Sequence, residues 1–185
     1  NKNGGSFLMA YNSTVGNVVQ TVTNTYQSFA AYTNVSTSSQ TTITQLTTSI
    51  TPKFNSSKIL ILASITYDWT RDNSGCGFVL FRDNQGGTDA DLAKGNAHGS
   101  NYRVYTDLGS NNNRDQSCMQ RTINLIDSPG TSNQIQYQIR LQNASNSSGQ
   151  NFILNASMHA NGNDTNQGDD PKCVSVVTLM ELAQA

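Results

Sequence analysis

The chain has 185 residues and a formal net charge of −1, and only 12% of its residues are charged. Its 11 basic residues are scattered, which argues against nucleic acid as a partner, because phosphate binding requires a concentrated basic patch. No window approaches the roughly 20 apolar residues that a membrane helix requires, so membrane insertion is not expected. A share of 35% apolar residues with so little net charge favours one globular domain over a disordered chain.

In chain order, residues 1–15 are interpreted as an N-terminal linker or attachment strand, and residues 16–185 as one domain. Within that domain, short β-prone segments alternate with clusters of Asn, Ser, Gly and Pro that are typical of turns. The expected strands cover residues 16–26, 43–50, 57–70, 75–83, 101–108, 118–127, 134–143, 151–158 and 173–183. This pattern predicts an all-β protein, a jelly roll or β-sandwich of about 8–10 antiparallel strands.

The clearest strand covers residues 57–70, where apolar side chains from Ile59 to Trp69 occupy every second position. Side chains on a strand point to opposite faces in turn, so this alternation predicts one buried face and one polar face. Segment 75–83 follows after a short loop, and the two segments are interpreted as a β-hairpin.

Segments 75–83 and 173–183 differ from the others because they are apolar on both faces. A lone sandwich buries only one face of each strand, so a second covering is expected, and a neighbouring subunit would supply it. A homotrimer is the predicted assembly. The candidate interface residues are Phe78, Val79, Leu80, Phe81, Val176, Val177, Leu179 and Met180.

The chain lacks the motifs of catalysis and of cofactor binding. There is no Gly-x-Ser-x-Gly, no Cys-x-x-Cys and no phosphate-binding glycine loop, and the only histidines are His98 and His159. We therefore predict no catalytic residues, no cofactor and no enzymatic activity. A weak calcium candidate exists at Asp164, Asp169 and Asp170, because carboxylate oxygens are the ligands that calcium prefers.

Aromatic and arginine side chains near strand ends are the best candidates for contact with a ligand or receptor, since Trp and Tyr stack on sugars and Arg anchors interfaces. These candidates are Trp69, Arg71, Tyr102, Arg103 and Tyr105, with packing in the core or between subunits as the open alternative. The three cysteines, at wide and unpatterned spacing, are expected to be free thiols.

Five blocks in order carry a family resemblance. They are GNVVQTVTNTY, ITPKFNSSKILILASI, GFVLFRD, NLIDSPGTSNQIQYQIRL and VSVVTLMELA, and they extend from residue 16 to residue 183. Together they resemble a module of bacteriophage and prophage virion proteins with the patterns G-x-V-x-Q-x-V, I-T-P-x-x-x-S-S-K-I-L, R-D, D-x-P, Y-x-[VI]-x and T-L-M-E-[IL]-A. The chain departs from that module in its three cysteines and in the long loop 159–172.

The resemblance implies a structural role in a tail fibre, head fibre or capsid-surface appendage, with a trimeric jelly roll similar in shape to tumour-necrosis-factor-like heads. It implies no catalytic residues. The leading hypothesis is therefore a non-enzymatic virion protein, assembled in the host cytoplasm. It would attach to other virion proteins through its N-terminal segment and display loops to a host glycan or receptor. The alternatives are a capsid decoration protein that stabilises the phage head, and a carbohydrate-binding lectin or glycan-active enzyme.

Overall fold

The computed structural model describes residues 17–35, 39–69, 76–85, 87–95, 104–108, 118–143, 150–157 and 173–183. These residues form β-strands and one short 3-10 turn, η1 (Thr44–Leu46). The strands are β1 (Val18–Tyr26), β2 (Ala30–Val35), β3 (Thr41–Thr42), β4 (Thr48–Ile50), β5 (Lys58–Trp69), β6 (Cys76–Asn84), β7 (Ala90–Leu92), β8 (Thr106–Asp107), β9 (Met119–Asp127), β10 (Ile135–Asn143), β11 (Gln150–Leu154) and β12 (Ser175–Leu182).

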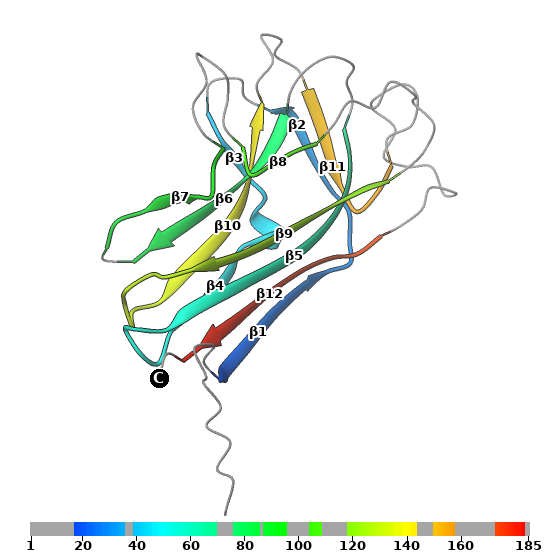
Figure 1. Cartoon of the computed structure of the whole chain (residues 1–185). Helices are drawn as coiled ribbons and strands as arrows, with labels where there is room; N and C mark the ends of the chain where they lie inside the picture. Colours follow the sequence, from blue (N-terminus) through cyan, green and yellow to red (C-terminus); the bar gives the residue numbers. More distant parts are fainter. Residues whose placement is uncertain are drawn as a thin grey trace, which may run out of the picture.

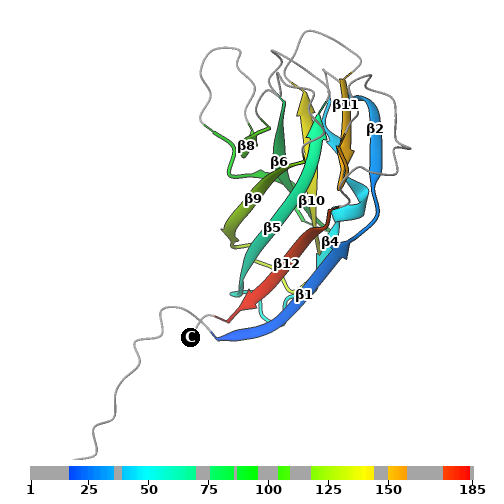
Figure 2. The ribbon, with the colours of Figure 1, turned by 90° about the vertical axis from the view of Figure 1, so that its right-hand side faces the viewer.

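The strands form two sheets that pack face to face (Figure 1 and Figure 2). The first sheet has the order β1–β12–β5–β11–β2, and β9 pairs with the other side of β5. The second has the order β3–β10–β6–β7, with β4 on β10 and β8 on β6. The chain changes sheet from β4 to β5, from β5 to β6, from β9 to β10 and from β10 to β11, so strands that are successive in the chain pack across the sandwich, as in a jelly roll. The predicted all-β jelly roll is confirmed.

The predicted hairpin between segments 57–70 and 75–83 is wrong. Strand β5 belongs to the first sheet and β6 to the second, so the chain crosses the sandwich between them. Their inward side chains meet in the core instead: the rings of Tyr67 and Phe78 lie 5.3 Å apart, edge to face. Phe152 of β11 stacks on Tyr67 at 5.6 Å. Burial of one face of each strand against the opposite sheet outweighs the local preference for a hairpin, because the aromatic side chains bury the largest apolar area.

The region predicted as a strand at 101–108 is a strand only at Thr106–Asp107 among its described residues. Cys76 is buried, Cys118 and Cys173 are half-buried, and none of the three forms a disulfide, as expected.

One end of the core is closed by a row of inward-facing side chains. The row runs through Gln20, Glu181, Ile59 and Asp127, which are direct neighbours in register on β1, β12, β5 and β9. Glu181 has no exposed surface, and Asp127 is 8% exposed. Two carboxylates in a buried row require hydrogen-bonding partners, because an unpaired buried charge is costly.

Glu181 obtains its partners from two separate segments, and we call this group of contacts the Glu181 node. Its Oε1 accepts hydrogen bonds from the hydroxyl of Ser57 at 2.6 Å and from the backbone N–H of Lys53 at 2.7 Å. Its Oε2 accepts one from the amide of Gln20 at 2.6 Å. Burial raises the pKa of Glu181, but these hydrogen bonds stabilise the carboxylate more and leave the pKa below its usual value. The node therefore fastens β1 and the β4–β5 loop to the last strand.

Asp127 bridges the two sheets in the same way, and we call its contacts the Asp127 node. Nη1 of Arg82, on β6, lies 2.9 Å from both carboxylate oxygens. The hydroxyl of Tyr137, on β10, donates to Oδ2 at 2.8 Å. Burial, and then the charge of Asp127, raise the pKa of Tyr137, so its hydroxyl remains a donor. A β9 carboxylate thus holds two strands of the opposite sheet.

Candidate functional site: an uncharged outer sheet face

The predicted ligand-contact residues do not come together in the described structure. Trp69 is only 2% exposed, and its indole N–H has no hydrogen-bond partner. The prediction that Trp69 offers its ring to a ligand is wrong, because its position on β5 has the parity of Ile59 and Ile61 and faces the core. Arg71, Tyr102 and Arg103 lie outside the described residues.

Tyr105 is half-buried and has a structural partner. Its hydroxyl donates to the carbonyl of Asn124 at 2.7 Å and accepts from the N–H of the same residue at 3.1 Å. Both groups belong to β9, the edge of the first sheet beside β5. Tyr105 therefore satisfies part of an open strand edge, which limits pairing of β9 with other chains.

Segment 75–83 was expected to need a neighbouring subunit to cover its second apolar face, and the structure corrects this expectation. Phe78, Val79 and Leu80 are each at most 1% exposed within the single chain. On the outward side of β6, Val104 covers Gly77, so closely that a Cβ on Gly77 would lie 2.6 Å from the valine. The ring of Phe81 is covered by the guanidinium of Arg140 at 3.3 Å. The second covering that this strand needs comes from its own chain.

The candidates on β12 divide between two faces. Val177 and Leu179 are at most 2% exposed and belong to the core. Val176 and Met180 alternate with them, are half-buried and face outward. Their contribution to a subunit contact stays a proposal. It concerns the outward face of the first sheet.

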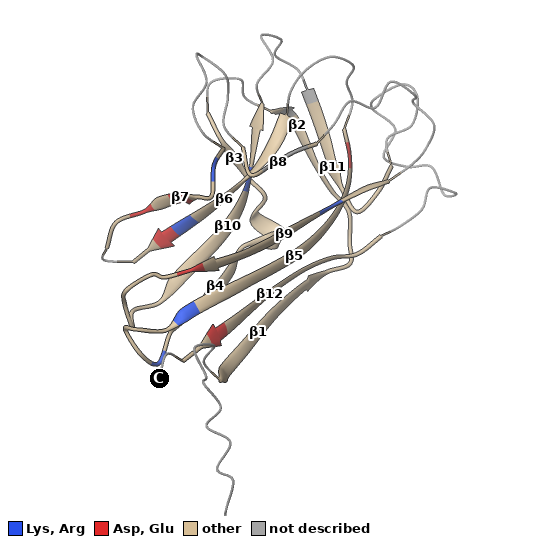
Figure 3. Ribbon diagram, in the orientation of Figure 1, with Lys and Arg blue, Asp and Glu red and all other residues tan. Residues whose placement is uncertain are grey.

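That face is composed of rows that run across four strands. In each row, residues of β1, β12, β5 and β9 are direct neighbours in register. The rows are Thr21–Met180–Leu60–Ile126, Thr23–Thr178–Leu62–Asn124 and Thr25–Val176–Ser64–Thr122. We call these residues the outer face. None of them is charged, and the charged residues of these strands lie toward the strand ends (Figure 3).

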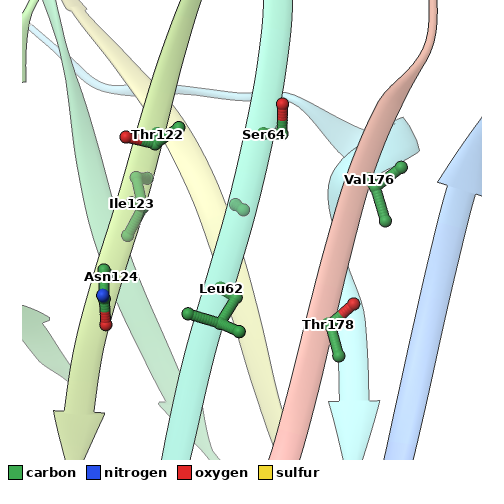
Figure 4. Close-up of a pocket in the computed structure, with 8 residues that line it drawn as sticks. Leu62, Ser64, Thr122, Ile123, Asn124, Val176 and Thr178 are labelled. Carbon is green, nitrogen blue, oxygen red and sulfur yellow. The ribbon is translucent and has the colours of Figure 1, made fainter.

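The middle of the outer face contains a shallow hollow of about 470 Å³. Leu62, Val176 and Thr178 line it together with Thr122 and Asn124, and Figure 4 shows Leu62 between the neighbouring strands β9 and β12. The floor is formed at Ala63 and Ile123, whose side chains are buried on the core side. Short side chains such as Ser64 leave this space open.

The chemistry of the outer face suits contact rather than reaction. Its polar groups are mainly hydroxyls, which both donate and accept hydrogen bonds. Two of them, on Thr23 and Thr178, lie 3.3 Å apart, and the amide of Gln120 donates to the hydroxyl of Ser64 at 2.8 Å. Ile126 is 54% exposed at the β9 side of the face. An uncharged surface of this kind, with hydroxyls beside aliphatic side chains, suits protein contact, because charged residues are depleted at the core of interfaces.

Sequence reasoning identified Val176 and Met180 but missed Leu60, Leu62 and Ile126. A signal was present: Lys58 to Leu62 contains four consecutive aliphatic residues, so β5 is apolar on its outward side as well. We interpreted β5 from the alternation farther along the strand and overlooked this run of aliphatic residues.

The structure offers no metal centre among the residues it describes, since no three His, Cys, Asp or Glu side chains gather there. The calcium candidates Asp164, Asp169 and Asp170, and both histidines, lie outside those residues. No helix in the described ranges is long and apolar enough to cross a membrane.

No protein-family model matches the chain, and no curated protein sequence is similar to it. Among solved structures, it is similar to a chain of the T13 particle of IBDV, with a TM-score of 0.46 and 10% identity over 92% of this chain and 37% of that one. It is also similar to a chain of infectious bursal disease virus strain Gx, with a TM-score of 0.42, 11% identity and coverage of 91% and 39%. A third is the VP2 subviral particle of that virus, with a TM-score of 0.41, 10% identity and the same coverage. The chain thus spans well under half the length of these capsid chains.

Proposed function

We propose that this chain is a non-enzymatic structural module of a bacteriophage virion. In this proposal it forms a trimeric head on a fibre or appendage, joins other virion proteins through its N-terminal segment, and displays loops for attachment to a host surface. Arg71, Tyr102 and Arg103 are the candidates for contact with a host glycan or receptor. Trp69 is withdrawn from that set because it is buried.

The observation that carries the proposal is the position of the residues that match the virion module. Gln20, Ser57 and Glu181 come from the blocks G-x-V-x-Q, S-S-K-I-L and T-L-M-E, and they meet in the Glu181 node. Arg82, Asp127 and Tyr137 come from the blocks R-D, D-x-P and Y-x-[VI], and they meet in the Asp127 node.

The blocks therefore specify how a sandwich is held together, which supports a resemblance in architecture. Six short patterns that converge on two buried contacts are a better match than the same patterns scattered over a surface. Because these side chains are used by the fold itself, they supply no open reactive group.

The outer face supports the assembly part of the proposal. Val176 and Met180 lie on it beside Leu60 and Leu62, and burial of such side chains is the main driving force for association. In the proposed trimer this face meets neighbouring copies. Three linked heads would multiply weak contacts between loops and receptor through their effective concentration.

Electron microscopy of phage particles with a labelled antibody against the purified chain tests the function. Label at a tail or head appendage is the expected result. Label distributed over the capsid shell would replace the proposal by the decoration protein, and absence of the chain from purified particles would overturn a virion role.

The molecular mass of the purified chain in solution tests the threefold contact. A multiple of three copies of 20.0 kDa is expected for the wild type. In Met180→Lys, the number of copies should no longer be a multiple of three. Lys53→Met, which changes an exposed loop residue outside the outer face, should leave the number of copies unchanged. A wild-type mass without a factor of three contradicts the trimer.

A further inference from the structure

The first sheet has two long edges, and they differ in how they are protected. At β9, the hydroxyl of Tyr105 occupies both backbone groups of Asn124. At the opposite edge, β1 pairs with β12 and with no other strand of the described residues, and it lies at the edge of the sheet in both views (Figure 1 and Figure 2). A strand with one unpaired side presents a row of N–H and C=O groups that can pair with another strand.

The composition of β1 contains none of the devices that prevent such pairing. Its sequence, Val-Val-Gln-Thr-Val-Thr-Asn-Thr-Tyr, has no charge, no proline and no glycine over nine residues. Edge strands usually avoid association through an inward charge, a proline, a bulge or short length. The one irregularity in the pairing of β1 lies near its start, between Val18 and Gln20. The remainder, through Tyr26, is regular and β-prone.

The side chains of β1 also suit pairing with a second, antiparallel copy of the same strand. Thr21, Thr23 and Thr25 are exposed on the outward side, while Val22 and Asn24 face inward. When two antiparallel copies of this strand are related by a two-fold axis at Val22 or at Thr23, threonine lies opposite threonine on the outer side. Such pairs are favourable across strands, and the chain already uses one between Thr23 and Thr178.

We propose that the free edge of β1 is a pairing site for the β1 strand of a second copy of this chain. The contact is isologous and antiparallel, and it continues the first sheet of one copy into the first sheet of the other. The occupant is a second copy because an uncharged edge meets no electrostatic repulsion from itself, and the threonine rows match under two-fold symmetry. This contact uses the backbone edge of β1, whereas the proposed threefold contact uses the side chains around Val176 and Met180 on the outer face, to which Thr23 also contributes.

Thr23→Lys tests the pairing, because it places two ammonium groups close to the two-fold axis. Thr122→Lys is the matched control, since it makes the same change at an exposed position of the outer face on β9, at the protected edge. By light scattering, the wild type should contain an even number of copies of 20.0 kDa, and Thr23→Lys should lose that factor of two. Thr122→Lys should leave the two-fold contact intact. Circular dichroism verifies that each variant is folded.

The masses separate this pairing from the proposed function. If both contacts exist, the wild type has a multiple of six copies, Met180→Lys has two, and Thr23→Lys loses the factor of two that Thr122→Lys keeps. If the threefold contact fails and the edge pairing stands, the wild type has two copies and Thr23→Lys has one. A wild-type mass of one or three copies, or an unchanged mass in Thr23→Lys, overturns the edge pairing.

Cross-linking gives a second readout that does not depend on weakening the contact. With the two-fold axis at Thr23, Thr23→Cys should form a disulfide-linked pair on mild oxidation, because facing residues of antiparallel strands lie within disulfide reach. With the axis at Val22, the double variant Thr21→Cys/Thr23→Cys should form it. Thr122→Cys and the wild type, which carries only its three native cysteines, should not. An equal yield from all these chains would contradict the proposal.

Discussion

The hydroxyl of Ser57 donates a 2.6 Å hydrogen bond to the carboxylate of Glu181, which lies 124 positions later in the chain. Ser57 directly precedes β5, and Glu181 is the penultimate residue of β12, the neighbouring strand. Since Glu181 has no exposed surface, its charge is stabilised only by the donors around it. The pair therefore joins the middle of the chain to its last strand at the closed end of the core.

Glu181→Gln should destabilise the protein by about 3 kcal/mol, because it replaces a charged acceptor of several hydrogen bonds by an amide that also presents donors. In a chain of this length that corresponds to a fall in Tm of roughly 6–12 °C. Urea unfolding measures the change. The matched control is Asp83→Asn, a half-buried carboxylate at the end of β6, for which we expect less than about 0.5 kcal/mol. Equal losses of unfolding free energy in the two variants would show that the Glu181 node stabilises the protein no more than an ordinary half-buried carboxylate does.

The same carboxylate predicts how stability depends on pH. The pKa of Glu181 is lowered in the folded state, so the unfolded chain binds a proton more readily. The stability that Glu181 contributes is complete above the ordinary glutamate pKa of 4.5 and is lost as the pH falls through the lower folded value. The unfolding free energy should therefore decrease on acidification below that pKa. This decrease should be smaller in Glu181→Gln, and parallel curves for the two proteins between pH 3 and pH 7 would contradict the assignment.

Tyr137→Phe should cost about 1–2 kcal/mol of stability, since it removes one donor from the buried carboxylate of Asp127 while Arg82 remains. In a double-mutant cycle with Arg82→Met, the two changes should not be additive, because both side chains act on one carboxylate. Additive unfolding energies would mean that Arg82 and Tyr137 stabilise the fold independently.

Gly77→Ala should destabilise the sandwich by about 1–3 kcal/mol, because the new methyl group would lie 2.6 Å from the side chain of Val104. Val104→Ala in the same chain should recover part of that loss by removing the γ-methyl groups. Thermal unfolding of the two single variants and the double variant measures the recovery. If Val104→Ala gives none, the cost arises from the backbone of β6 and not from this contact.

Trp69 is the only tryptophan of the chain, so its fluorescence reports its surroundings directly. At 2% exposure, the native protein should emit at short wavelength and resist quenching by iodide, and both properties should be lost on unfolding in urea. Strong quenching in the folded state would return Trp69 to the set of possible ligand contacts.

The sequence by itself determined the class of the fold. Alternation with a period of two at Ile59 to Trp69 and at Ile135 to Leu141 is a local property, since it follows from the geometry of a single strand. It predicted which side chains of β5 and β10 face the core. The small number of charged residues likewise argued against nucleic acid as a partner.

Only the tertiary structure decided which strands are partners. Strands β5 and β6 follow each other in sequence but belong to opposite sheets, because Tyr67 and Phe78 gain more by meeting across the core than by lying side by side. Pairing in the sheets joins residues that are distant in the chain, and no local pattern records that register.

The same limit explains the candidate site. Apolar residues on both faces of β6 indicated that something covers the strand twice, but not that the covering is Val104 and Arg140 of the same chain. The outer face exists because Leu62, Val176 and Asn124 become neighbours through pairing of β5 with β12 and β9. The alternation of apolar and polar residues, and the burial that follows from it, can be predicted from the local sequence. A surface composed of four strands depends on their register, which only folding sets.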